Sequence, residues 1–276
     1  MNNIKLICTD IDGTLFNSKS QINKKDKEML QKVWNEKKIP IALVSGRFKG
    51  GLTFIEEELE IPCIYSCFNG SYVEWQGNII QDTRIDLEDL KKVIPVIQKT
   101  NSTPQIFDLF DYYFNDDNQW VSHQINMCGY EGKIGDLFKQ IEIWEKENYA
   151  PYKMLAKNDN PEELENTRKA LLDLNLKSLS IVQSSSFIIE IFPSSSHKGR
   201  TIELLANYFN INKNEIMAFG DYYNDIEMLN EAGVSIAMGN AKKEVKEIAK
   251  YTTDTNDNNG IAKAINKFIF EDKYKI

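Results

Sequence analysis

The stretch Leu6-Ile7-Cys8-Thr9-Asp10-Ile11-Asp12-Gly13-Thr14 joins a short apolar run to two carboxylates, a glycine and a threonine. The apolar run predicts a buried strand that ends at Asp10, and Gly13 indicates a turn that brings both acids to the strand's carboxyl end. Open α/β sheets bind their ligands at that end of their strands. Two carboxylates this close repel each other unless a cation or a proton lies between them. The stretch therefore predicts a site for a hard metal ion, a proton transfer, or both. An acidic turn that caps the following segment is the alternative.

Length and composition exclude several classes of protein. A chain of 276 residues, 42% of them hydrophobic, can bury one large core or two smaller ones. The net charge of -8 argues against nonspecific binding to nucleic acid or to a membrane surface. We find no signal-peptide pattern and no window near the ~20 apolar residues of a membrane span. The four cysteines form no CxxC pair, which is typical of reduced thiols and predicts a cytoplasmic protein.

The chain shows two different patterns of predicted strands and helices. Apolar strands and helices alternate over about the first eighty residues and again after Pro193, which predicts a parallel sheet buried on both faces. The middle of the chain has amphipathic strands and helices, which predict a separate α+β insertion. We therefore expect an α/β protein with a discontinuous core at residues 1–83 and 189–276 and an inserted domain at 84–188. Glu190 is then expected on the strand that re-enters the core.

Two further strand-to-helix junctions carry polar groups. Ser45-Gly46-Arg47 follows the second apolar strand, and a hydroxyl and a backbone amide at a helix start form an anion site. An ordinary N-cap serine is the alternative. Lys198 begins a helix, where a cation is unfavourable against the helix dipole, so it needs an anionic neighbour or else lies in solvent.

The segment Gly220-Asp221-Tyr222-Tyr223-Asn224-Asp225 follows another apolar strand. Asn224 or Asp225 can cap the next helix, but this leaves Asp221 without a role. Several carboxylates at one sheet edge would repel one another unless a divalent cation binds them. Oxygen ligands without histidine or cysteine indicate Mg²⁺ rather than Zn²⁺.

One more acidic stretch, Asp254-Thr255-Asn256-Asp257-Asn258-Asn259-Gly260, is similar to a calcium-binding loop. Its glycine comes one place late and no glutamate closes it, so we expect a polar loop without a metal.

Taken in order, these residues resemble the signature of the haloacid dehalogenase-like hydrolases. That signature is an Asp-x-Asp-Gly-Thr, a Ser or Thr after the second strand, a Lys, and a Gly-Asp-x-x-x-Asp. The insertion lies between the second and third motifs, as in the Cof-type sugar-phosphatase-like branch with a large cap, and Asn69-Gly70 matches that branch as well. The resemblance covers the entire chain and implies a Rossmann-like core with an inserted α+β cap domain.

The resemblance implies a phosphatase that acts on phosphate monoesters of small metabolites, such as sugar phosphates or cofactor phosphates. Asp10 would be the nucleophile that forms an aspartyl-phosphate. Asp12 would be the general acid for the leaving alcohol and then the base for the hydrolytic water.

The same resemblance implies a set of binding groups. Mg²⁺ would be held by the Asp10 carboxylate, the Asp12 backbone carbonyl and Asp221, with Asp225 ordering the outer shell of the metal and Lys198. The phosphoryl oxygens would be held by five groups: Ser45, the Gly46 amide, Lys198, Asn224 and the backbone amide of Ile11. Lys198 thus counts both as a catalytic and as a phosphate-binding residue.

Some alternatives stay open at this point. Asp12 argues against a dehalogenase or a P-type ATPase, but a phosphomutase keeps both acids, and a catalytically silent sensor of a phosphorylated metabolite could keep the fold. His197, before the key lysine, departs from the branch and either touches substrate or lies on the surface. The aromatic residues near Phe107–Phe114 are expected mostly in the core of the cap. As partners we expect a small phosphorylated metabolite, no nucleic acid and no membrane, in a monomer or a weak homodimer.

Overall fold

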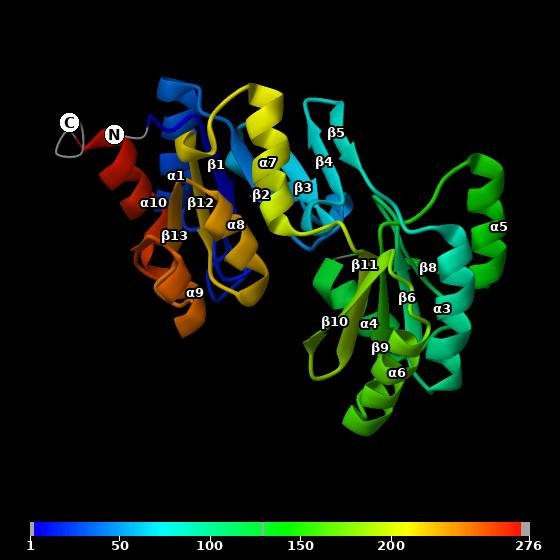
Figure 1. Ribbon diagram of the computed structural model, residues 1–276. Helices are drawn as coiled ribbons and strands as arrows, with labels where there is room; N and C mark the ends of the chain where they lie inside the picture. Colours follow the sequence, from blue (N-terminus) through cyan, green and yellow to red (C-terminus); the bar gives the residue numbers. More distant parts are fainter. Residues whose placement is uncertain (1–2, 129, 272–276) are drawn as a thin grey trace. The chain divides into compact units, whose positions relative to one another are not determined.

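The computed structural model describes residues 3–128 and 130–271, which form two compact units (Figure 1). Among these residues, the first unit contains 3–47, 52–82 and 197–271, and the second contains 48–51 and 83–196. No helix in the described ranges is long and apolar enough to span a bilayer.

The first unit is built on an eight-stranded sheet in the order β14-β13-β12-β1-β2-β3-β4-β5. The strands from β14 to β3 pair in parallel, whereas β4 and β5 extend the sheet as an antiparallel hairpin. The strands are β1 Leu6–Thr9, β2 Ile41–Val44, β3 Cys63–Cys67, β4 Tyr72–Trp75, β5 Asn78–Asp82, β12 Ile216–Gly220, β13 Val234–Ala237 and β14 Tyr251–Thr252. The helices are α1 Lys24–Lys32, α2 Thr53–Leu59, α7 Lys198–Phe209, α8 Ile226–Glu231, α9 Lys243–Ile248 and α10 Gly260–Ile265.

Both faces of this sheet are covered. Leu6 and Cys8 point to one face, where they form a core with residues of α7 and α8 such as Leu205 and Met228. Successive strand residues point to opposite faces, so Ile7 lies on the other side and is also fully buried. Because both faces of this parallel sheet are buried, the sequences of its strands are continuous apolar runs. The predicted α/β class with a Rossmann-like core is confirmed.

The second unit has a six-stranded sheet in the order β10-β11-β9-β6-β7-β8. Its strands are β6 Thr103–Phe107, β7 Tyr112–Phe114, β8 Lys133–Ile134, β9 Lys153–Lys157, β10 Leu179–Ser185 and β11 Ile188–Pro193. Its helices are α3 Leu87–Lys99, α4 Gln119–Cys128, α5 Leu137–Glu147 and α6 Pro161–Asp173. Residues of α3, α5 and α6 form a core with one face of this sheet, including Trp144 and Leu171. Most of the aromatic residues expected in this core are buried, whereas Phe110 is exposed.

The end of the inserted domain differs from the expected boundary at residues 188 and 189. That boundary falls inside β11, which pairs with β9 and β10 of the second unit. The return to the first unit comes at residue 197. Glu190 accordingly forms an ion pair with Lys153 of β9, 3.3 Å away. The prediction that its strand belongs to the sheet of the first unit was wrong. The strand is apolar enough to suit either sheet, so its composition could not decide between them.

Two adjacent leucines of α6 offer a matched test of the second core. Leu171 is fully buried, whereas Leu172 is 47% exposed. We expect Leu171→Ala to lower the free energy of unfolding by about 2–5 kcal/mol, because it leaves a cavity. Leu172→Ala should change it by less than about 0.5 kcal/mol. Urea unfolding measures both values, and equal losses would contradict the packing described here.

Candidate active site

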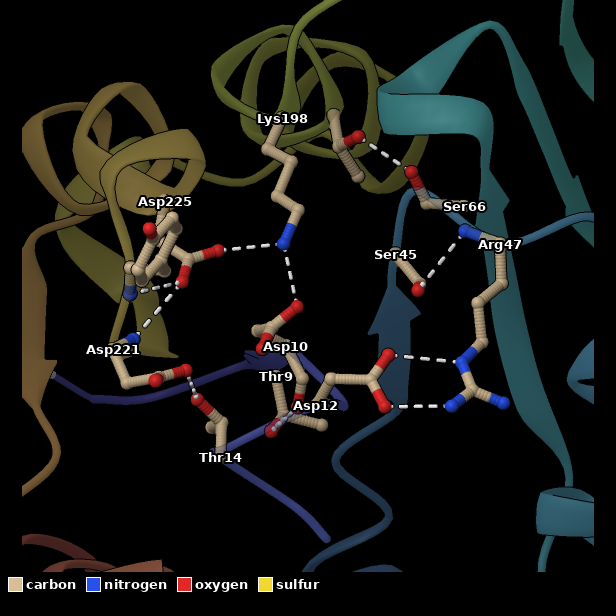
Figure 2. Close-up of polar contacts among 12 residues, drawn as sticks. Thr9, Asp10, Asp12, Thr14, Ser45, Arg47, Ser66, Lys198, Asp221 and Asp225 are labelled. Carbon is tan, nitrogen blue, oxygen red and sulfur yellow. Dashed lines mark hydrogen bonds and ion pairs between the residues drawn. The ribbon is translucent and has the colours of Figure 1, made fainter. Parts of the chain in front are cut away.

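Three neighbouring parallel strands bring polar residues to one edge of the first sheet. Asp10 follows β1, Ser45 follows β2 and Asp221 follows β12, and these strands lie side by side in the order β12-β1-β2. Lys198, the first residue of α7, points toward the same place (Figure 2). The carboxyl edge of a doubly wound sheet is where such folds bind ligands.

Lys198 lies between two carboxylates. Its Nζ is 2.5 Å from Oδ1 of Asp10 and 2.6 Å from Oδ1 of Asp225, and the side chains of Lys198 and Asp225 are almost completely buried. Burial opposes the charge of the lysine, but the two carboxylates outweigh it and hold the pKa of Lys198 above its ordinary value. The unfavourable position of a cation at the start of a helix is thus offset by two anions.

Asp10, Asp221 and Asp225 form a carboxylate cluster in which each offers an oxygen within 4.8 Å of the others. Burial, followed by the charge of Asp225, raises the pKa of Asp10 to about 8. Burial is also the largest reason why the pKa of Asp221 rises to about 6. One lysine therefore faces three acids, and the site lacks positive charge. The three carboxylates offer hard oxygen ligands that lie close enough together to bind one metal ion, which fits Mg²⁺.

The two oxygens of Asp225 are already engaged. Oδ1 accepts from Lys198, and Oδ2 accepts from the backbone N–H groups of Asp221, at 2.9 Å, and Tyr222, at 3.0 Å. Gly220 allows this close approach, because a Cβ there would lie 2.5 Å from Cβ of Asp225. Asp225 thus orders both the lysine and the loop that carries Asp221, which suits the outer-shell role that the resemblance implies.

The turn after Asp10 is fixed against Asp221. Thr14 donates its hydroxyl to Oδ1 of Asp221 at 2.9 Å. Gly13 has a φ of +85°, and a Cβ there would lie 2.5 Å from Oδ2 of Asp221. Glycine is therefore required twice over, by the backbone conformation and by the space. Ile11 has a completely buried side chain, so it can offer a ligand only its backbone.

The carboxylate of Asp12 lies outside the carboxylate cluster. It is 58% exposed and forms a two-pronged contact with Arg47, whose Nε is 2.9 Å from Oδ2 and whose Nη2 is 2.6 Å from Oδ1. The guanidinium also lies 5.6 Å from the ring centre of Phe16. Sequence reasoning gave Arg47 no role, although its place directly after Ser45-Gly46 was a signal. A ligand role for Asp12 toward a metal at the cluster would have to use its backbone carbonyl.

The predicted anion site follows β2. Ser45 is buried, and its Oγ accepts from the backbone N–H of Arg47 at 3.1 Å. The next loop is joined to it, since the N–H of Asn69 donates to the carbonyl of Ser45 at 2.9 Å. Gly46 lies against the carboxamide of Asn69, where a Cβ would come within 3.3 Å of Oδ1. Asn224 lies in the short 3₁₀ turn before α8 and is exposed.

His197 is the N-cap of α7. Its Nδ1 accepts from the backbone N–H of Arg200 at 3.2 Å and lies 3.4 Å from Oε2 of Glu227. This contact explains the histidine locally, as a cap for the helix that positions Lys198.

Residues 7–265 match the family of haloacid dehalogenase-like hydrolases, and the chain belongs to this family. The resemblance drawn from the four motifs is confirmed, because the match runs through all of them.

The relatives include two phosphatases of Bacillus subtilis. The chain is 29% identical over 266 residues to 5-amino-6-(5-phospho-D-ribitylamino)uracil phosphatase YcsE, with 96% of each chain covered. It is 26% identical over 279 residues to phosphatase YwpJ, covering 94% of this chain and 98% of that one. Among solved structures, TM0651 from Thermotoga maritima is 26% identical and superposes with a TM-score of 0.86 over 97% of this chain and 98% of the other. The family and the relatives named as phosphatases show that the protein is a phosphatase.

Lys198 provides a direct test of the charge arrangement. Replacing it in Lys198→Met leaves buried carboxylates without their cation, and we expect the free energy of unfolding to fall by about 3–5 kcal/mol in EDTA. Lys213→Met is the matched control, because Lys213 pairs with Glu231 on the surface. That change should cost at most about 1 kcal/mol. Similar losses for both variants in urea unfolding would contradict a buried ion pair at Lys198.

Proposed function

We propose that this protein is a Mg²⁺-dependent phosphatase that hydrolyses phosphate monoesters of small metabolites through an aspartyl-phosphate on Asp10. The observation that carries the proposal is the buried carboxylate of Asp10 held against Lys198 within a cluster of three acids. A dianionic substrate can approach an anionic nucleophile only where cations offset their repulsion. The cluster offers a place for a divalent cation and already contains an ammonium group.

Asp10 and Asp12 divide the chemistry. A carboxylate oxygen of Asp10 forms a bond to phosphorus while the bond from phosphorus to the ester oxygen breaks, and Asp12 gives its proton to the departing alcohol. Asp12 then takes a proton from water, whose oxygen attacks phosphorus and releases Asp10 and phosphate. Arg47 holds the Asp12 carboxylate outside the acidic cluster by two hydrogen bonds, so Asp12 has to leave Arg47 and take up a proton before it can act as the acid.

Several uncharged and cationic groups suit the phosphoryl oxygens. Lys198 supplies charge, and the remaining donors are the Ser45 hydroxyl, the Asn224 carboxamide and the backbone amides of Ile11 and Gly46. Preorganised donors around a transferring phosphoryl group supply most of the acceleration in this class of reaction. Ser45 is already oriented, because its hydroxyl oxygen accepts from the following turn.

The residues that would hold Mg²⁺ are Asp10 and Asp221 through their carboxylates and Asp12 through its backbone carbonyl, with Asp225 in the outer shell. When bound, the ion supplies positive charge beside the phosphoryl oxygens. The hydrogen bond from Thr14 fixes one oxygen of Asp221 and so orients the carboxylate for this purpose.

The substrate class is a small phosphorylated metabolite, such as a sugar phosphate or a cofactor phosphate. The name of the relative YcsE gives it a ribityl phosphate substrate, which supports this size and chemistry. We propose that the inserted second unit is a cap domain and that it selects the leaving group. A cytoplasmic location suits the thiols of Cys8, Cys63 and Cys67, which are all buried.

Phosphate release from an aryl phosphate and from a panel of metabolite phosphates tests the proposal. We expect Asp10→Asn to lower kcat by at least about a thousandfold, because the amide cannot form the phosphoenzyme. Asp173→Asn, which removes one exposed negative charge at the end of α6, should leave kcat unchanged. Metabolite binding without release by the wild type would indicate a sensor instead. Transfer of phosphate to a second hydroxyl would indicate a phosphomutase.

Binding of Mg²⁺ can be measured without turnover. At about 100 times its dissociation constant, Mg²⁺ should raise the free energy of unfolding of the wild type by about 2.7 kcal/mol. Asp221→Asn should lose most of this gain, while Asp173→Asn should retain it. Chemical denaturation with Mg²⁺ and with EDTA gives both values, and full retention in Asp221→Asn would contradict the metal assignment.

A further inference from the structure

The polar loop Asp254–Gly260 has no part in the four motifs, and neither has Asn240, which comes earlier in the chain. Both contact the loop that follows Asp10. Asn240 lies after β13, and the polar loop lies between β14 and α10. The catalytic loop, residues 11–16, carries Asp12. Its backbone N–H groups form turn hydrogen bonds: those of Thr14 and Phe16 donate to the carbonyl of Ile11, at 3.3 and 2.8 Å, and that of Leu15 donates to the carbonyl of Asp10 at 3.3 Å.

Two carboxamides complete the hydrogen bonding of this loop. Asn240 donates from Nδ2 to the carbonyl of Gly13 at 2.8 Å, and Asn256 donates from Nδ2 to the carbonyl of Phe16 at 2.8 Å. The two asparagines are also joined, because Oδ1 of Asn240 accepts from the backbone N–H of Asn256 at 3.0 Å. Asn256 is buried, whereas Asn240 is exposed. We call Asn240 and Asn256 the carboxamide pair.

A second group of contacts extends the arrangement past Phe16. Asn23 donates to the carbonyl of Asn256, and its Oδ1 accepts from Nδ2 of Asn17 at 2.8 Å. Asp257 accepts from the backbone N–H of Ser18 at 2.9 Å. The polar loop thus contacts the chain at Phe16, Ser18 and Asn23.

The two acids of the polar loop have partners within the protein. Asp254 is paired with Lys263 and accepts from the N–H of Thr255, and Asp257 is bonded to Ser18. The similarity to a calcium-binding loop reflects a need for short polar side chains in tight turns.

Carboxamides suit this position physically. Buried or half-buried carbonyls need donors, and the loop around Gly13 belongs to no strand ladder that could supply them. An asparagine side chain supplies such a donor without changing the charge of the site. Asp221 already holds the other side of the loop through Thr14. The catalytic loop is thus fixed from two directions.

We propose that Asn240 and Asn256 are positioning residues that fix the loop carrying Asp12, so that its carboxylate and backbone carbonyl are placed for the reaction. The inference rests on the proposed function, since it assigns a purpose to the position of Asp12. Neither asparagine touches the reacting atoms.

Hydrogen exchange tests the contact itself without any turnover. In Asn240→Ala the amides of residues 11–17 should exchange about tenfold faster, because one hydrogen bond that holds the loop is lost. Asn240→Asp keeps the acceptor for Asn256 but cannot donate to Gly13, and it should show the same increase. Asn258→Ala is the control, because this exposed carboxamide donates to Thr255 of its own loop. Unchanged exchange in both Asn240 variants would overturn the proposal.

Kinetics tests the purpose. The Asn240 variants should misplace the proton donor Asp12. For an alkyl phosphate, whose alcohol is a poor leaving group, their kcat should fall by about tenfold or more, with KM changed by less than about threefold. Hydrolysis of an aryl phosphate depends less on the proton, so its kcat should fall less. A fall in thermal stability with kcat unchanged for both esters would show a merely structural pair and would overturn the proposal. Absence of phosphate release by the wild type would contradict the proposed function, while the exchange experiment would still decide the contact.

Discussion

The ion pair of Lys198 with Asp10 and Asp225 is the interaction on which the rest of the site depends. Three carboxylates converge at one sheet edge with little exposure to water, and a single ammonium group lies between two of them. Burying one uncompensated charge is costly, so the lysine and its acids require one another. The remaining shortage of positive charge would favour a divalent cation, since a cation would relieve the repulsion among the acids.

The fold explains why these groups meet although they lie far apart in the sequence. Parallel strands point the same way, so the residues after β1, β2 and β12 reach the same edge. Each junction then uses local backbone chemistry: Gly13 and Gly220 admit close neighbours, and His197 caps the helix of Lys198. Apart from residues 48–51, the second unit lies between β5 and α7 in the chain, so it does not interrupt the strands that carry the site.

The sequence predicted the parallel core and the four polar junctions, because each buried strand is a continuous apolar run that ends in a recognisable turn. It could not predict the partners of those residues. The pairing of Arg47 with Asp12, and of Asn240 and Asn256 with the catalytic loop, joins segments whose contact depends on tertiary structure. The strand β11 was assigned to the wrong sheet because an apolar strand with one charge, Glu190, suits either neighbour until its partner Lys153 is known. The metal, phosphate and catalytic roles of the site residues stay predictions.

Rapid acid quenching during turnover, followed by peptide mapping of the phosphorylated protein, shows directly whether Asp10 is the nucleophile. We expect phosphate on Asp10, in the peptide that contains Leu6–Thr14, with formation and decay at rates that support kcat. Phosphate release without any label on this peptide, or a label on another residue, would contradict the assignment of Asp10 as the nucleophile.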